Sequence, residues 1–214
     1  MTILNAICSS DRVLLSADTA CGVPGGKKSR TTKIFPLMHF PAIIAGTGST
    51  ELAPALQMTL VNETDFDTVL TNLPSRISQL YSKIKSELFS VVKIHILERQ
   101  GIFIAGWSVS RNRFLARWVH QDNESSGFQI ASFDDSFLLT PWEGEPPPLP
   151  VMRGDLVELA RRQYKIWQAK RPDAAFGGEL IVAELTKNAI SIELVWDLNR
   201  DCPQCKLAPS IRSD

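Results

Sequence analysis

The chain has 214 residues, enough to bury a substantial core within one domain. Its 23 Lys and Arg residues balance its 23 Asp and Glu residues, so the formal net charge is zero. A neutral chain lacks the basic surface that phosphate binding needs, which argues against nucleic acid as the main partner. No apolar run reaches the roughly 18 residues that span a bilayer, and no signal segment opens the chain. We expect one cytoplasmic domain over residues 1–214 without membrane contact, its tail irregular from about residue 201.

The four cysteines are irregularly spaced and form no recognisable disulfide framework, so we expect a reduced protein. Cys202 and Cys205 have the spacing of a zinc knuckle or a redox pair, but no second Cys or His pair lies near them in the sequence. An exposed tail is the better interpretation. We therefore expect no metal and no cofactor.

Short apolar runs separated by turn signals predict two hairpins in the first part of the chain. Their strands are expected at 3–8 with 12–18, and at 32–37 with 42–46. The glycine- and proline-rich stretch 22–26 predicts a loop. Ser49 is expected to cap a helix with apolar positions at Leu52, Leu56 and Leu60. A second helical stretch is expected from about 65 to 88, kinked or restarted at Pro74.

The second part of the chain predicts mostly strands. These are expected at about 91–97, 101–109, 113–120 and 127–131, and later at 179–186 and 189–196. The proline-rich run 146–150 predicts a stiff internal connector. A helix with Asp155 in its first turn is expected to continue to about Lys170. This order of elements indicates two sheets between layers of helices.

Thr2 is the first candidate for chemistry, because it directly follows Met1. Methionine is usually removed before a small residue such as threonine, and removal would give Thr2 a free α-amine beside its hydroxyl. That amine titrates near neutrality, at roughly pH 7.7–8.0, so it can act as the general base for the hydroxyl. Thr2 is therefore a candidate nucleophile.

Three further residues would complete such a site. The ammonium group of Lys33 would stabilise the attacking oxygen, and the Asp18 carboxylate would keep that lysine charged and oriented. The Gly46 N–H could donate to the oxyanion. Each residue also has an ordinary interpretation: a turn former for Asp18, a strand-edge charge for Lys33, and a strand-to-helix turn for Gly46.

Together these residues resemble the β-subunits of proteasomes and their bacterial relatives, which are N-terminal-nucleophile hydrolases. The match consists of Thr2 at the mature N-terminus, Asp18 at the end of the second strand, Lys33 at the start of the third, and the motif Ile44-Ala45-Gly46-x-Gly48. The spacing from Thr2 to Asp18 is that of the family, and the spacing from Asp18 to Lys33 is about one residue short. The resemblance extends over about the first sixty residues and returns weakly near 173–185.

The resemblance implies a four-layer αββα sandwich and a threonine-type peptidase subunit, closest in character to the betaproteobacterial homologues. It implies a self-compartmentalising homo-oligomer of two stacked heptameric rings, with hexameric rings as second choice, acting on peptides or unfolded proteins, with an unfoldase ATPase as a possible partner. By position, Cys21 and Gly22 would pair with an extended substrate, and Ile44 would line the specificity pocket. Asp173 would support the N-terminal amine. The stretches 52–60 and 66–88 carry more apolar residues than one face of a monomer readily buries, which also indicates that a partner subunit covers part of these helices.

The chain departs from the family pattern in the residues expected around the amine. Phe176 stands where the family has a serine, the mid-chain stretch 136–141 lacks the glycine of a Ser-Gly element, and Ala20 replaces an arginine. These departures favour a second hypothesis, a weak or inactive ring protein that acts as a scaffold or binding chamber. A small-molecule amidase with the same nucleophile remains a third alternative.

Overall fold

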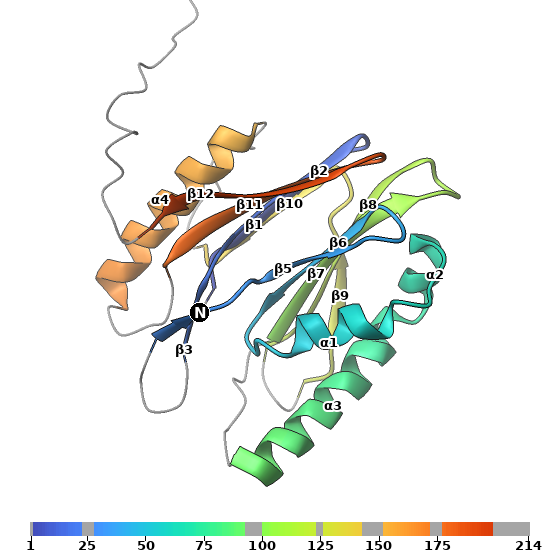
Figure 1. The fold of residues 1–214 in the computed structure, drawn as a ribbon, viewed down its shortest axis with the longest axis horizontal. Helices are drawn as coiled ribbons and strands as arrows, with labels where there is room; N and C mark the ends of the chain where they lie inside the picture. The colour runs from blue at the N-terminus through green and yellow to red at the C-terminus, as the bar shows by residue number, and fades with distance from the viewer. Residues whose placement is uncertain are drawn as a thin grey trace, which may run out of the picture.

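The computed structural model describes residues 2–22, 28–92, 100–122, 126–142, 152–171 and 177–198. Within these ranges the chain is a mixed α+β structure in which strands outnumber helices (Figure 1). The α+β class expected from the sequence is thus confirmed. None of the described helices combines the length and the apolar character needed to cross a bilayer.

Two five-stranded antiparallel sheets make up most of the described structure. The first sheet has the order β10 (Ser136–Thr140), β1 (Leu4–Cys8), β2 (Arg12–Asp18), β11 (Glu179–Thr186) and β12 (Ile190–Asp197). The second has the order β5 (Ile34–Leu37), β6 (Ala42–Thr47), β7 (Gln100–Ser108), β8 (Arg113–Gln121) and β9 (Gln129–Ser132). A separate small hairpin pairs β3 (Ala20–Gly22) with β4 (Lys28–Arg30).

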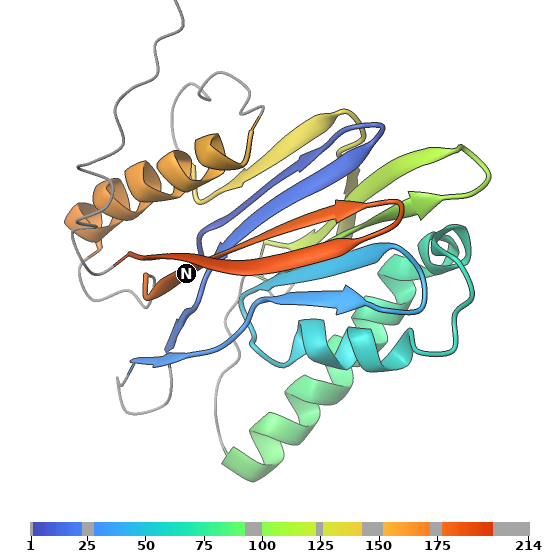
Figure 2. The same cartoon turned by 45° about the horizontal axis from the view of Figure 1, so that its top comes forward.

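The two sheets pack against each other through one apolar cluster. Leu4 and Leu15 of the first sheet belong to the same buried cluster as Phe103 and Phe114 of the second. Alternating side chains of each strand supply this contact because successive residues point to opposite faces of a sheet. Figure 2 shows the two sheets lying one over the other along their length.

Helices cover the remaining faces of the sheets. The second sheet packs against α1 (Leu52–Thr59), α2 (Phe66–Thr71) and α3 (Leu73–Val92) through a cluster that includes Leu56, Phe66 and Ile104. The first sheet packs against α4 (Arg153–Lys170), where Ala160 contacts the cluster of Ile3 and Val182. Figure 1 shows α4 on one side of the molecule and α1 and α3 on the other.

Most elements expected from the sequence are confirmed. The hairpins β1–β2, β5–β6 and β11–β12, the strands β7 to β9 and the helix α4 lie within one or two residues of their expected bounds. The long helical stretch divides at Asn72, and Pro74 lies in the first turn of α3, where a missing N–H costs little. Strands β3, β4 and β10 were not expected, because their short runs carry little pattern of their own.

Two expectations about local structure were wrong. A strand is expected at 91–97, but its first two residues are the last two residues of α3, which ends at Val92. The helical periodicity of α3 therefore outweighs the β-propensity of these two valines. Residues 93–99 lie outside the described ranges. Ser49 does not cap α1. The cap position is Glu51, and the Ser49 hydroxyl donates to the Glu51 carboxylate instead.

Many of the apolar side chains of 52–60 and 66–88 are covered within the chain itself. Leu52, Leu56, Leu60, Leu73 and Ile77 are fully buried within the chain itself. These five side chains therefore give no support to an oligomer, which stays a prediction. The proline-rich connector at 146–150 and the tail from 201, with Cys202 and Cys205, lie outside the described residues.

Candidate functional site

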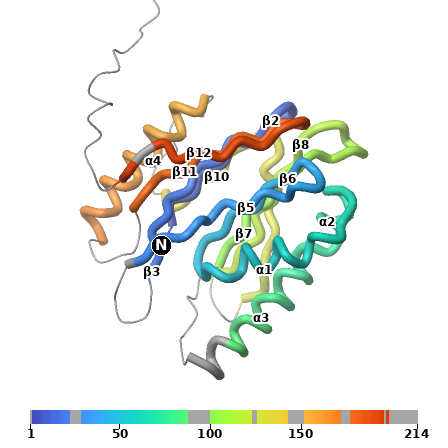
Figure 3. The backbone as a smooth tube through the Cα atoms, in the orientation of Figure 1, coloured from blue at the N-terminus to red at the C-terminus, as the bar shows by residue number. Residues whose placement is uncertain are grey.

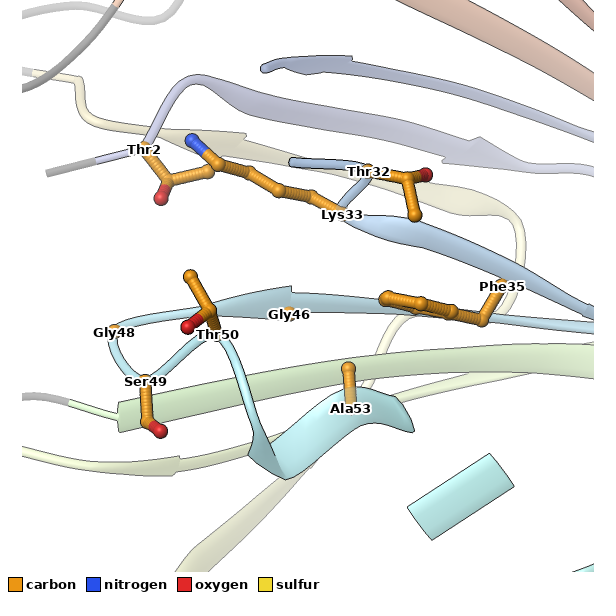
Figure 4. A pocket seen from close by; sticks show the side chains of 9 residues that line it. All are labelled: Thr2, Thr32, Lys33, Phe35, Gly46, Gly48, Ser49, Thr50 and Ala53. Carbon is orange, nitrogen blue, oxygen red and sulfur yellow. The ribbon is translucent and has the colours of Figure 1, made fainter. Parts of the chain in front are cut away.

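A pocket lies where the N-terminal end of β1 meets the ends of β5 and β6. Nine residues line it: Thr2, Thr32, Lys33, Phe35, Gly46, Gly48, Ser49, Thr50 and Ala53. Figure 4 shows the Lys33 side chain extending toward Thr2, with Thr50 and Ala53 on the opposite side of the pocket. Figure 3 shows the chain start beside the beginning of β5. Three of the residues expected in a catalytic site, Thr2, Lys33 and Gly46, thus share one pocket.

Lys33 and Asp18 form a buried ion pair. The Lys33 Nζ donates to Asp18 Oδ1 at 2.7 Å, and the exposed fractions of the two side chains are 6% and 0%. An ion pair so far from water is not screened as a surface pair is. The carboxylate therefore holds the ammonium group in one position beside Thr2.

The Asp18 carboxylate accepts two further hydrogen bonds, both from the backbone. Ile3 N donates to Oδ1 at 2.9 Å, and Gly177 N donates to Oδ2 at 2.8 Å. Burial raises the pKa of Asp18, while Lys33 and these two N–H groups act in the opposite direction. All three partners donate, so the carboxyl group is suited to its charged form.

The strand register explains why these residues meet. In the hairpin β1–β2, Leu4 pairs with Ala17, so Ile3 stands opposite Asp18, and the Asp18 N–H donates to the Ile3 carbonyl at 3.1 Å. Thr2 is therefore fixed next to the carboxylate through its neighbour. Thr2 is itself 92% buried, with an exposed fraction of 8%.

Gly46 occupies the expected place, but its N–H already has an acceptor. It donates to the Lys33 carbonyl at 3.1 Å, which extends the β5–β6 ladder by one pair. An oxyanion could use this N–H only by sharing it with that carbonyl. The oxyanion role of Gly46 therefore stays a prediction, and it requires that the N–H be shared with the Lys33 carbonyl. A side chain at this position would also be excluded, since an added Cβ would lie 2.9 Å from the Ala53 Cβ.

The two glycines just before β11 lie next to the Oδ2 atom of Asp18, to which the Gly177 N–H donates. Gly177 and Gly178 have φ angles of 108° and 75°, which glycine adopts readily. The Gly178 position also has no room for a side chain, because an added Cβ would lie 2.7 Å from Thr19 Oγ1. Sequence reasoning did not identify this glycine pair as a partner of Asp18. Asp173 and Phe176 lie outside the described residues, so their roles stay predictions.

The residues expected to bind substrate lie in different places, Cys21 and Gly22 in the small hairpin and Ile44 in the core. Cys21 and Gly22 lie in β3, which is paired with β4 on one edge. Their pairing with a substrate stays a prediction. Ile44 is not among the residues that line this pocket and is fully buried in the core cluster beneath α1, so its role in specificity stays a prediction. Its side chain faces the helix layer, and Phe35 and Ala53 provide the apolar lining instead.

Several lining residues were missed by the sequence analysis. Five residues are concerned: Phe35 in β5, Thr32 just before it, Ser49 and Thr50 in the turn that leads into α1, and Ala53 in the first turn of α1. Their signal in the sequence is weak, since small and hydroxylated residues are common in any turn. Only their position next to the motif around Gly46 could have suggested them.

No protein-family model matches the chain, and no curated protein matches it in sequence.

Proposed function

We propose that the chain is a threonine-type peptidase subunit of the N-terminal-nucleophile class, with Thr2 as nucleophile once the peptide bond before it is cleaved. The observation that carries this proposal is the buried ion pair of Lys33 and Asp18 beside Thr2 in one pocket. Burying an ion pair costs desolvation free energy, and buried ionisable groups in a pocket are concentrated at functional sites. The two-sheet structure with helices on both outer faces fits the four-layer αββα sandwich that the resemblance implies.

In the proposed reaction the Thr2 hydroxyl attacks the carbonyl carbon of a peptide bond. Its proton passes to the Thr2 α-amine, and the same proton then goes to the leaving amine of the substrate as the C–N bond breaks. An ester between Thr2 and the acyl fragment remains. Water hydrolyses this ester with the α-amine again as base, which regenerates Thr2.

Each neighbour of Thr2 has one role in this scheme. The positive charge of Lys33 lowers the cost of negative charge on the Thr2 oxygen, and Asp18 keeps Lys33 charged and directed at it. The oxyanion needs an N–H donor, which Gly46 supplies if its bond to the Lys33 carbonyl is shared or opened.

The remaining parts of the proposal rest on the resemblance alone. We infer a cytoplasmic homo-oligomer of two stacked rings, heptameric or, as second choice, hexameric. Its substrates are peptides or unfolded proteins, and an ATPase that unfolds them is a possible partner. No cofactor enters the scheme.

A second candidate function is a ring protein that serves as a scaffold or binding chamber. The observation that favours it is the Gly46 N–H, which is already bonded within the sheet. A site without a free oxyanion donor loses about 10²–10³ in rate. The pocket would then bind without efficient turnover.

The test compares protein that begins at Thr2 with protein that begins at Met1, each verified by mass spectrometry. The probe is a peptide epoxyketone, whose double attachment needs both a hydroxyl and an adjacent amine. We expect labelling of Thr2, and hydrolysis of fluorogenic peptides, in the first protein only. Equal turnover by both proteins would refute the mechanism, and labelling without turnover would favour the binding chamber.

A further inference from the structure

Gln100 is a buried polar residue next to the pocket that the mechanism above does not use. Its side-chain Oε1 accepts a hydrogen bond from the Ser49 N–H at 2.7 Å, and its exposed fraction is 2%. Ser49 lies between Gly48 and Thr50, and all three residues line the pocket. Gln100 thus contacts the pocket wall from behind, from the first position of β7.

This hydrogen bond lies just past the end of the β6–β7 ladder. The β6–β7 ladder ends at the pair of Thr47 and Gly101. The Ser49 N–H, two residues past that pair, points toward β7, where it donates to Gln100 Oε1. Its acceptor there is the amide side chain of Gln100. The side chain therefore continues the ladder at the point where the chain turns away into α1.

The turn itself needs such support. Gly48 has a φ angle of 91°, which takes the chain out of strand geometry. Three further hydrogen bonds of the turn are exposed. The hydroxyls of Ser49 and Thr50 donate to the Glu51 carboxylate at 2.5 and 2.8 Å, and the Glu51 N–H donates to Ser49 Oγ at 3.3 Å. Water competes more directly with exposed hydrogen bonds than with one that is partly shielded. Of these four bonds, the one to Gln100 is the one that is partly shielded from solvent.

We propose that Gln100 is a positioning residue that holds the wall formed by Gly48, Ser49 and Thr50 at a fixed separation from Thr2. The wall is the face of the pocket opposite Thr2 and Lys33 in Figure 4. Its effect on reactivity rests on the proposed function, whereas its effect on the turn does not. Gln100 does not touch the reacting atoms, so its loss weakens ligand binding and leaves the chemical step unchanged.

The experiment uses four variants of the full chain. Gln100→Met keeps the length of the side chain without an acceptor, and Gln100→Asn keeps the amide but withdraws it by one methylene. Gln100→Glu retains an acceptor for the Ser49 N–H. Gln121→Met is the matched control, because Gln121 pairs with Gln100 across β7 and β8, has an exposed fraction of 6%, and bonds to Ser126 instead of the pocket wall.

Two measurements are made on each variant. Amide hydrogen exchange reports on residues 48–50, and the concentration dependence of epoxyketone labelling separates the inhibition constant KI from the maximal labelling rate. We expect faster exchange at Ser49 and an increase of about 10- to 100-fold in KI for Gln100→Met and Gln100→Asn, with the maximal rate unchanged. Gln121→Met is expected to keep the wild-type exchange and KI, and Gln100→Glu is expected to keep the wild-type exchange at Ser49.

Unchanged exchange at Ser49 in Gln100→Met and Gln100→Asn would overturn the proposal. So would an equal effect in Gln121→Met, since this would indicate a general loss of stability. If wild-type protein beginning at Thr2 is not labelled at all, the proposed function fails, and the exchange measurement alone decides the role of Gln100.

Discussion

The Lys33 ammonium group and the Asp18 carboxylate are 2.7 Å apart and almost completely shielded from solvent. Removing one partner of such a pair leaves a buried charge without compensation, which typically costs about 3–5 kcal/mol. The pair therefore affects both the stability of the chain and the reactivity of Thr2. These two effects can be separated by experiment.

Lys33→Met is expected to lower the labelling rate of Thr2 by at least about 10²-fold, because the charge that stabilises the attacking oxygen is lost. The variant is also expected to be less stable by about 3 kcal/mol in urea unfolding, since Asp18 is left unpaired. The double variant Lys33→Met with Asp18→Asn is expected to recover much of this stability but none of the labelling. If the double variant is labelled at the wild-type rate, Lys33 has only a structural role.

The protein is expected to assemble into a large homo-oligomer, on the basis of the resemblance alone. Light scattering at micromolar concentration should give a mass many times that of the 23.8 kDa chain. The expected value is that of two stacked heptameric rings, and hexameric rings are the second choice. A mass equal to that of one chain would exclude the compartment and leave a free-standing hydrolase.

The Cys8 thiol is expected to make stability depend on pH in the alkaline range. Burial raises its pKa to about 12, whereas an unfolded thiol titrates near about 8.5. The folded state therefore keeps the proton that the unfolded state loses, and the stabilisation is lost as pH rises from about 8.5 to 12. Relative to Cys8→Ala, the wild type should lose about 2 kcal/mol of unfolding free energy between pH 7 and pH 10.

Thiol reactivity provides a control for this prediction. In a chain with Cys202→Ser and Cys205→Ser, only Cys8 and Cys21 remain. Cys21 is partly exposed, so we expect it to react with a disulfide reagent at pH 8 while Cys8 reacts only after unfolding. Rapid reaction of both thiols in the native protein would contradict the burial of Cys8.

Gly101→Ala is expected to destabilise the second sheet by about 1–3 kcal/mol through overpacking. An added Cβ would lie 2.1 Å from the Trp118 ring and 2.8 Å from Thr47 Oγ1. Trp118→Leu removes that ring, so the double variant should be more stable than the sum of the two single effects predicts. Additive effects in thermal unfolding would show that the ring moves aside without cost.

Much of the fold could be predicted from the sequence because the signals are local. The hairpin β1–β2 follows from two apolar runs around a polar turn, and the division between α2 and α3 follows from Pro74. Strand β10 was missed because it is a short run whose pairing partner, β1, lies more than 120 residues earlier in the chain. A pairing over that distance has no local signal.

The sequence by itself determined the candidate residues Thr2, Asp18 and Lys33, since their chemistry and their positions at strand ends can be read along the chain. Only the tertiary structure decided their partners. The Gly177 N–H that bonds Asp18 comes from 159 residues away, and the Gln100 side chain behind the pocket wall comes from 51 residues beyond Ser49. Hydrogen bonds of this kind depend on sheet register, which is set by packing across the whole core and not by the neighbouring residues.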